Sequence, residues 1–98
     1  MSTHVITVVD ATIDPARETD LLAGFRALNE GERPAGLLRS QLLRGQDGAW
    51  RIETTWDSME ALMELRRAGR PPAALALLEG LGAEHTHAWF TVEQSDED

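Results

Sequence analysis

Residues 37–62 read LLRSQLLRGQDGAWRIETTWDSMEAL, and this stretch decides the fold. Residues 37–44 and 49–56 flank the short segment Gly-Gln-Asp-Gly. The pair Asp47 and Gly48 tolerates the positive φ angles that tight hairpins need. The stretch therefore predicts two paired antiparallel strands joined by a tight turn.

A helix is predicted directly after this hairpin. Asp57 and Glu60 are three residues apart and form a capping-box pattern at its start. The segment 69–72, Gly-Arg-Pro-Pro, ends it, because glycine is common just after a helix and proline cannot continue one. Apolar side chains recur at helical spacing between these limits: Met59, Leu62 and Met63.

The chain before the hairpin predicts one strand and one helix. Residues 5–13 are rich in β-branched side chains and form a short apolar run, which favours a buried strand over a helix. Asp14 followed by Pro15 is an N-cap with proline at the first helical position. The helix extends to the glycine-containing segment 31–36, and its apolar face is formed by Leu21, Leu22, Phe25 and Leu28.

The chain after the second helix adds a short helix over residues 73–81 and a last strand over residues 84–93. The order is therefore β-α-β-β-α-(α)-β. This order matches the α+β class and, within it, the ferredoxin-like βαββαβ fold, in which helices cover one face of a four-stranded antiparallel sheet. The other face of such a sheet is left bare.

Composition limits the domain count and the function classes. The 98 residues suit a single domain, predicted over residues 1–94, with residues 95–98 as a flexible acidic tail. A net charge of −8 repels a nucleic-acid backbone, and the absence of cysteine excludes disulfides and thiolate metal sites. No apolar run is long enough to span a membrane, and residues 1–10 lack the features of a signal peptide. We expect a cytoplasmic protein with neither nucleic-acid nor membrane partners.

The alternation of side chains along each strand predicts which face they occupy. In the third strand, one side carries mostly apolar residues that suit a layer under helices: Trp50, Ile52, Thr54 and Trp56. In the last strand, the side chains expected under the helices are Thr86, Ala88, Phe90 and Val92. The bare face then receives a mixed set that includes Ile6, Val8, Leu37, Leu43, His85, His87 and Trp89.

This mixed face is too apolar to stay in contact with water and too polar to be the core of a monomer. A second copy, related by a two-fold axis, would cover it with a self-complementary interface between two sheets. We therefore expect a homodimer with the architecture of a dimeric α/β barrel.

The element order and the segment 50–62, WRIETTWDSMEAL, resemble the antibiotic biosynthesis monooxygenase family of dimeric α/β-barrel proteins. The resemblance implies a homodimer that needs no metal or flavin, so no cofactor is expected. It implies that catalytic members oxidise an electron-rich aromatic substrate, such as an anthrone or a hydroquinone, with molecular oxygen. The pocket of such members lies between the sheet and the helices, and Trp56 corresponds to the signature tryptophan of the family.

The chain also departs from the family's pattern. The second helix carries Leu65, Arg66 and Arg67 where members often have a histidine, and the chain contains no tyrosine. Ile52 and Leu62 stand near the cavity, where catalytic members often use asparagine, tyrosine or histidine. The heme-degrading branch needs a histidine on the second helix and an asparagine on the first strand, so heme is not expected.

Flat and adaptable side chains are candidates for contact with an aromatic substrate, with plain core packing as the alternative. The indole N–H of Trp56 needs an acceptor if it is buried, either a substrate oxygen or a nearby carbonyl. Arg66 either offsets an enolate charge or pairs with a neighbouring acid. The predicted substrate-binding residues are Trp56, Trp50, Phe25, Met59, Met63, Phe90 and Arg66.

Three side chains are candidates for the chemistry. His85 and His87 lie two apart on the last strand, and histidine is the best-matched base near neutral pH. They are alternatively interface residues that bond to Glu53 or across the dimer, and no metal is expected because a third ligand is missing. Asn29 either orients a substrate hydroxyl or caps its own helix. The histidines are expected on the bare face and the pocket on the other, so one reaction uses both only if the strand is bulged or the site opens toward the interface.

These residues favour a cofactor-independent monooxygenase that acts on a polyketide-type aromatic substrate. Two alternatives stay open at this point. One is a cyclase or isomerase that uses the same pocket for proton transfer alone. The other is a non-catalytic accessory dimer that binds a small ligand, which the scarcity of polar groups on the helix side favours.

Overall fold

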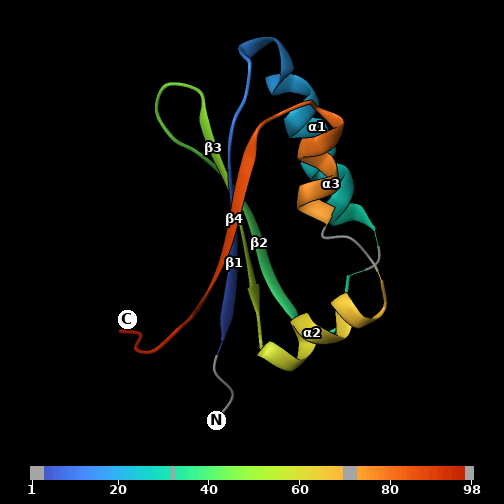
Figure 1. Ribbon diagram of the computed structural model, residues 1–98, viewed down its shortest axis with the longest axis vertical. Helices are drawn as coiled ribbons and strands as arrows, with labels where there is room; N and C mark the ends of the chain where they lie inside the picture. Colours follow the sequence, from blue (N-terminus) through green and yellow to red (C-terminus); the bar gives the residue numbers. More distant parts are fainter. Residues whose placement is uncertain (1–3, 32, 70–72, 97–98) are drawn as a thin grey trace.

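A four-stranded antiparallel sheet organises the computed structural model of the protein, which describes residues 4–31, 33–69 and 73–96 (Figure 1). The elements are β1 (Val5–Thr12), the short 3-10 turn η1 (Pro15–Arg17), α1 (Glu18–Glu30), β2 (Leu37–Arg44), β3 (Ala49–Trp56), α2 (Met59–Arg67), α3 (Ala73–Gly80) and β4 (His85–Thr91). The strands lie in the order β2-β3-β1-β4. Helices α1 and α3 pack together over one end of one sheet face, and α2 lies over the other end of that face. This arrangement confirms the predicted α+β, ferredoxin-like fold.

Local chemistry sets the ends of the elements that the sequence predicted best. Asp14 Oδ1 accepts a hydrogen bond from the backbone N–H of Ala16 at 2.9 Å, so the predicted cap begins η1, which leads into α1. Asp47 and Gly48 have φ angles of 55° and 82°, as their place in the hairpin requires. Turn and cap residues act through their nearest neighbours, which is why sequence alone locates them.

The start of α2 differs from the expectation by one residue. The Ser58 hydroxyl, rather than Asp57, accepts from the backbone N–H of Ala61, at 3.2 Å. The backbone N–H of Asp57 donates instead to the carbonyl of Gly36 at 2.8 Å. Gly36 has a φ of 85°, and a Cβ at this position would collide with the Ala61 side chain. The absence of a side chain at Gly36 therefore lets the start of α2 approach the segment before β2.

Gly36→Ala is expected to lower the free energy of unfolding by about 2–4 kcal/mol, because it adds a steric clash to the cost of a positive φ. Gly69→Ala is the matched control. Gly69 has a φ of 74° but nothing within 4 Å of the added methyl group, so only the cost of the positive φ, about 1 kcal/mol, applies. Urea titration measures both losses. Equal losses would contradict the close approach at Gly36.

The helix-covered face of the sheet consists of four cross-strand rows, each with one residue per strand. Residues that pair across neighbouring strands point to the same face, so the register defines the rows. In the order β2, β3, β1, β4, the rows are Arg44, Trp50, Ala11, His85; then Leu42, Ile52, Val9, His87; then Ser40, Thr54, Thr7, Trp89; and then Leu37, Trp56, Val5, Thr91.

The expected orientation of β4 is wrong. Val9 pairs with His87 and Thr7 pairs with Trp89, so these two β4 side chains lie on the helix-covered face. Phe90 pairs with Ile6 on the bare face, where it is 57% exposed. The alternation was correct, but β4 is an edge strand with one neighbour, and its Phe90 does not face the helices. Thr86 and Ala88 therefore lie on the bare face, and His85 and Thr91 on the covered face.

A second correction concerns Leu37. The pairing of β2 with β3 shifts by one residue between Leu37 and Arg39. Such a bulge inserts one residue and reverses the alternation on one side of it. Leu37 therefore points to the helix-covered face beside Trp56, whereas Leu43 stays on the bare face, as expected.

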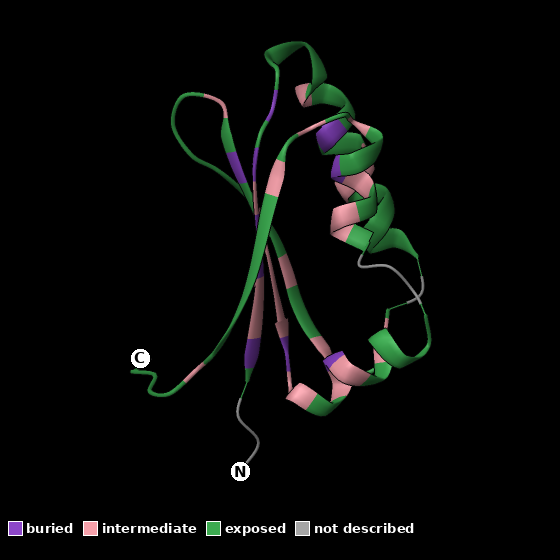
Figure 2. Ribbon diagram, viewed as in Figure 1, coloured by how far each residue is buried: buried purple, intermediate pink, exposed green. Residues whose placement is uncertain are grey.

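The buried core is divided into two clusters at opposite ends of the sheet (Figure 2). One cluster packs the first two rows against α1 and α3, with Leu21 and Leu78 almost completely buried. The other packs Val5 and Trp56 against Leu62 of α2. The third row lies between the clusters. A gap in the core is therefore centred on the row that carries Ser40, Thr54 and Thr7.

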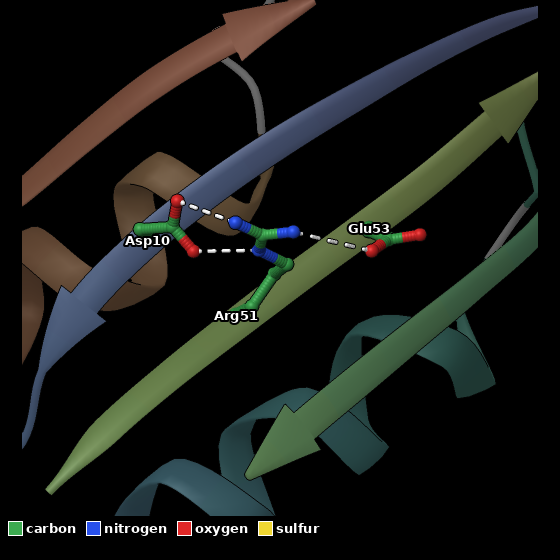
Figure 3. A network of polar contacts seen from close by, with 3 residues as sticks. All are labelled: Asp10, Arg51 and Glu53. Carbon is green, nitrogen blue, oxygen red and sulfur yellow. Dashed lines mark hydrogen bonds and ion pairs between the residues drawn. The ribbon is translucent and has the colours of Figure 1, made fainter. Parts of the chain in front are cut away.

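The bare face carries an ion-pair network (Figure 3). Arg51 on β3 donates two hydrogen bonds to the Asp10 carboxylate on β1, at 2.7 and 3.1 Å. Its guanidinium also lies 3.7 Å from Glu53 on the same strand. The hydrogen bond to Asp10, aided by the charge of that carboxylate, raises the pKa of Arg51 above its ordinary value. Glu53 lies on this face, whereas His85 and His87 lie on the helix-covered face, so the bond to Glu53 that was one alternative for the two histidines does not form.

Some predictions fall partly outside the described residues. These are positions 1–3 of the predicted domain, position 32 of the first glycine-containing segment, positions 70–72 of the second, and positions 97–98 of the acidic tail. Within the described ranges, none of the helices combines the length and the apolar character needed to cross a membrane.

Candidate functional site

A cavity of about 270 Å³ lies between the sheet and the helices. Its floor includes Ser40, Thr54 and Thr7, which we call the hydroxyl row. The end of α1 forms one wall, and α2 and the first turn of α3 form others. At the edge strand β4, the exposed side chains of His87 and Trp89 complete the lining. We call this space the sheet–helix cavity.

The side chains of the third row explain why the cavity exists. Neighbouring rows carry Ile52 and Trp56 on β3, and these large residues fill the space beneath the helices. Thr54 between them is smaller, and its neighbours in the row are also hydroxyl residues. The Thr7 hydroxyl donates to the backbone carbonyl of Thr54 at 3.4 Å, which leaves the Ser40 and Thr54 hydroxyls to meet a ligand. The row is thus both a gap in the apolar core and a line of hydrogen-bonding groups.

Trp56 provides a hydrogen-bond donor without an acceptor. The residue is only 5% exposed and lines the cavity. Its indole Nε1 is buried, and no acceptor for it exists among the residues that the structure describes. A buried donor left unpaired costs about 1–3 kcal/mol, so an oxygen atom of a ligand at this position would recover that cost.

Trp50 resembles Trp56 but lies elsewhere. Its Nε1 is equally buried and, within the described ranges, equally without an acceptor. It belongs to the first row, in the core cluster beneath α1 and α3, and does not line the cavity. The guanidinium of Arg44 lies 4.2 Å from the centre of its ring. Trp50 therefore offers a natural comparison for the role of Trp56.

The structure brings together half of the predicted site residues. Those that line the sheet–helix cavity are His87, Asn29, Trp56, Phe25 and Arg66. Those that do not are His85, Trp50, Met59, Met63 and Phe90. Met59 packs in the core cluster with Trp56, and His85 lies in the first row, with Nδ1 3.2 Å from the carbonyl of Ala83. The roles themselves remain predictions.

The placement of His87 removes the geometric conflict between the base and the pocket. With β4 oriented as observed, His87 shares the helix-covered face with Trp56 and the hydroxyl row. No bulge in β4 is needed to bring it there. Trp89 was missed for the same reason, because the expected orientation of β4 placed it on the bare face. The signal that could have placed both His87 and Trp89 in the site was the alternation of imidazole and indole side chains along β4.

Asn29 is held by its own helix, which was one of the two alternatives for this residue. Its Nδ2 donates to the carbonyl of Phe25 at 2.8 Å. This bond fixes the side-chain amide at the cavity wall and leaves Oδ1 as an acceptor. Asn29 can therefore accept from a substrate hydroxyl while it stays anchored to α1.

The described part of the chain contains no cluster of side chains that could bind a metal ion. No three side chains among its histidines and carboxylates lie close enough together to hold a metal ion. The cavity lining instead combines hydroxyls, an amide, an imidazole and an indole N–H with apolar surface. These groups can orient an oxygenated aromatic ring, move a proton and hold a developing negative charge.

The fold and the cavity define a small α+β protein with a pocket between its sheet and its helices, and solved structures share this fold. The chain shares its fold with structures provisionally assigned as antibiotic biosynthesis monooxygenases. One is from Caulobacter crescentus, with 18% identity over 91% of this chain and 89% of that chain and a TM-score of 0.68. Another is from Nitrosomonas europaea, with 10% identity over 93% and 91% of the two chains and a TM-score of 0.69. The fold that the resemblance of residues 50–62 implied is confirmed.

A more specific likeness is to SnoaB, a cofactor-independent oxygenase from Streptomyces nogalater. It is 26% identical to this chain, with a TM-score of 0.66, and the match covers 96% of this chain and 97% of SnoaB. No protein-family model matches the sequence, and no curated protein matches it.

Proposed function

We propose that the protein is a cofactor-independent monooxygenase that oxidises an electron-rich, polyketide-type aromatic substrate, an anthrone or a hydroquinone, with molecular oxygen. The observation that carries this proposal is the buried Nε1 of Trp56, which has no acceptor among the described residues and lies beside a cavity floored by hydroxyls. The likeness to SnoaB, an oxygenase described as cofactor-independent, supports it. The cavity volume of about 270 Å³ lies near the lower end of small-molecule pockets, which suits a planar ligand of about two or three fused rings.

The proposed reaction needs little from the protein, because the substrate supplies the electrons. His87 accepts a proton from the substrate and so forms an enolate or phenolate that can reduce oxygen. The indole N–H of Trp56 and the hydroxyls of Ser40 and Thr54 stabilise the negative charge that develops on oxygen. For an anthrone, the methylene carbon becomes a carbonyl. One oxygen atom enters the product, and the other leaves as water with the two methylene hydrogens.

Oxygen uptake tests this proposal. Anthrone and hydroquinone substrates are mixed with the protein in an oxygen electrode, and the product is analysed after reaction under ¹⁸O₂. We expect consumption of one O₂ per substrate and one labelled oxygen atom in the product. Consumption no faster than the uncatalysed rate throughout the panel would reject the oxygenase. Conversion without oxygen would instead support the cyclase or isomerase, and binding without conversion the accessory dimer.

His87→Gln is expected to lower the oxidation rate by about 100-fold or more, because glutamine cannot accept the substrate proton. His85→Gln is the control. His85 lies two residues away on the same strand face but outside the cavity lining. Initial rates of oxygen consumption compare the two variants. An unchanged rate for His87→Gln would remove this residue as the base.

We also propose that a second copy of the chain covers the bare face, as a homodimer. The face carries apolar side chains beside the charged network of Asp10, Arg51 and Glu53, a mixture that suits a self-complementary interface. Phe90, at 57% exposure, and Leu43, at 37%, are large apolar groups on this face. Covering them removes apolar area from water, which favours association.

Phe90→Arg is expected to weaken this dimer by about tenfold or more, because it places a charge in an apolar interface. Leu22→Arg, at a 48% exposed position on α1, is the control that changes charge equally away from the bare face. Analytical ultracentrifugation gives the masses. A wild-type protein that sediments at 10.8 kDa, the mass of one chain, would contradict the dimer.

A further inference from the structure

The charge of the cavity lining is opposite to that of the whole protein. The chain carries 17 acidic residues and a net charge of −8. Among the described residues, no aspartate or glutamate lines the sheet–helix cavity, and Arg66 is the one permanently charged side chain in the lining. An acidic protein repels anions in general, so one arginine in an otherwise neutral cavity makes a local exception.

Arg66 is not committed to an ion pair with any residue in the ranges 4–31, 33–69 and 73–96. Its neighbour Arg67 pairs with Glu64 of the same helix, at 3.2 Å. Arg17, Arg44 and Arg51 also have carboxylate partners. A basic residue in the last turn of a helix stabilises the helix dipole, and both Arg66 and Arg67 lie in that turn. Unlike Arg67, Arg66 has a guanidinium that stays available for a ligand, because it has no carboxylate partner in the described ranges.

We propose that Arg66 determines substrate specificity by binding a carboxylate group that the aromatic substrate carries apart from its reacting ring carbon. The inference rests on the proposed function, since it names the substrate class of the same cavity. A guanidinium binds a carboxylate through two parallel hydrogen bonds, which fix orientation as well as adding affinity. A ligand anchored in this way at α2 would extend toward the hydroxyl row, Trp56 and His87, all of which line the same cavity.

A matched pair of unreactive ligands tests the inference without any turnover. Anthraquinone-2-carboxylate and anthraquinone-2-carboxamide have nearly the same shape and differ by one negative charge. Isothermal titration calorimetry gives the dissociation constant of each. Because Arg66 is solvent-exposed, we expect the wild-type protein to bind the acid about fivefold to tenfold more tightly than the amide at low salt. Raising the ionic strength should reduce this preference.

Two neighbouring variants complete the design. Arg66→Gln should abolish the preference for the acid and change the affinity for the amide by less than about twofold, because only the charge is lost. Arg67→Gln removes the same charge one residue away, outside the cavity lining, and should behave like the wild type. Equal wild-type affinities for the two ligands would overturn the inference, as would equal effects of the two variants. A preference for the acid in a protein that consumes no oxygen would support the inference while rejecting the proposed oxygenase.

Discussion

Trp56→Phe is expected to reduce turnover by about 100-fold, the usual effect of removing one donor to a developing oxyanion. Phenylalanine keeps an aromatic ring in the core cluster with Val5 and Leu62 but lacks the indole N–H. Because that N–H has no acceptor among the described residues, its removal from the free protein also removes an unpaired buried donor. This gain offsets part of the lost packing. We therefore expect the free energy of unfolding to stay within about 1 kcal/mol of the wild type.

Trp50→Phe separates catalysis from packing in this comparison. Trp50 is as buried as Trp56, at 5% exposure, and its Nε1 is likewise unpartnered in the described ranges. It lies outside the cavity, so its variant should match Trp56→Phe in stability and the wild type in turnover. Steady-state kinetics and urea titration give both quantities. Equal losses of turnover in the two variants would show that Trp56 contributes to core packing and not to catalysis.

Thr54→Ile is expected to fill the cavity. It replaces a hydroxyl in the centre of the hydroxyl row with a larger apolar group, where empty space is available. Overfilling a ligand site costs about 1–3 kcal/mol, so affinity for the anthraquinone ligands should fall about tenfold to 100-fold. Burying the added methylene groups should raise the free energy of unfolding by about 1 kcal/mol. The variant is therefore expected to be more stable than the wild type but to bind the ligands less tightly.

Thr55→Ile is the matched control for Thr54→Ile. Thr55 is the next residue of β3, and its pairing with Ile6 places it on the bare face. The same substitution there should leave ligand affinity unchanged. Titration calorimetry and thermal unfolding measure the effects. A Thr54→Ile protein that binds the ligands as tightly as the wild type would show that they do not enter the sheet–helix cavity.

The sequence predicted the architecture because the signals involved are local. The hairpin followed from Asp47 and Gly48, whose positive φ angles the structure confirms, and both strands of the hairpin have the predicted ends. The N-cap at Asp14 was found from its immediate neighbours. The predicted cap of α2 was wrong by one residue, since Ser58 and not Asp57 caps the helix. The side chains of both residues can accept the capping hydrogen bond.

The faces of the strands were harder to predict because they depend on the register of pairing. The period of β4 was correct, but its phase was chosen from apolarity, and Phe90 in fact lies exposed on the bare face. A one-residue shift at the β2 bulge likewise moved Leu37. Both errors affected the candidate site. The wrong orientation of β4 placed His87 outside the pocket, and the unrecognised bulge in β2 placed Leu37 outside it.

The cavity itself was beyond what sequence could establish. A void depends on what several elements leave unfilled, and only the register places Ser40, Thr54 and Thr7 in one row. Half of the predicted site residues line the cavity, because aromatic and methionine side chains serve the core as readily as a pocket. Met59 and Trp50 are core residues of this kind.

A crystal structure of the protein with bound anthraquinone-2-carboxylate tests the central claim most directly, namely that the space between sheet and helices holds an oxygenated aromatic ligand. We expect the rings to lie over the hydroxyl row, with a ring oxygen within about 3 Å of Trp56 Nε1. A ligand bound on the bare face or at another surface, with Trp56 Nε1 still unpartnered and the cavity closed by side chains, would contradict the account.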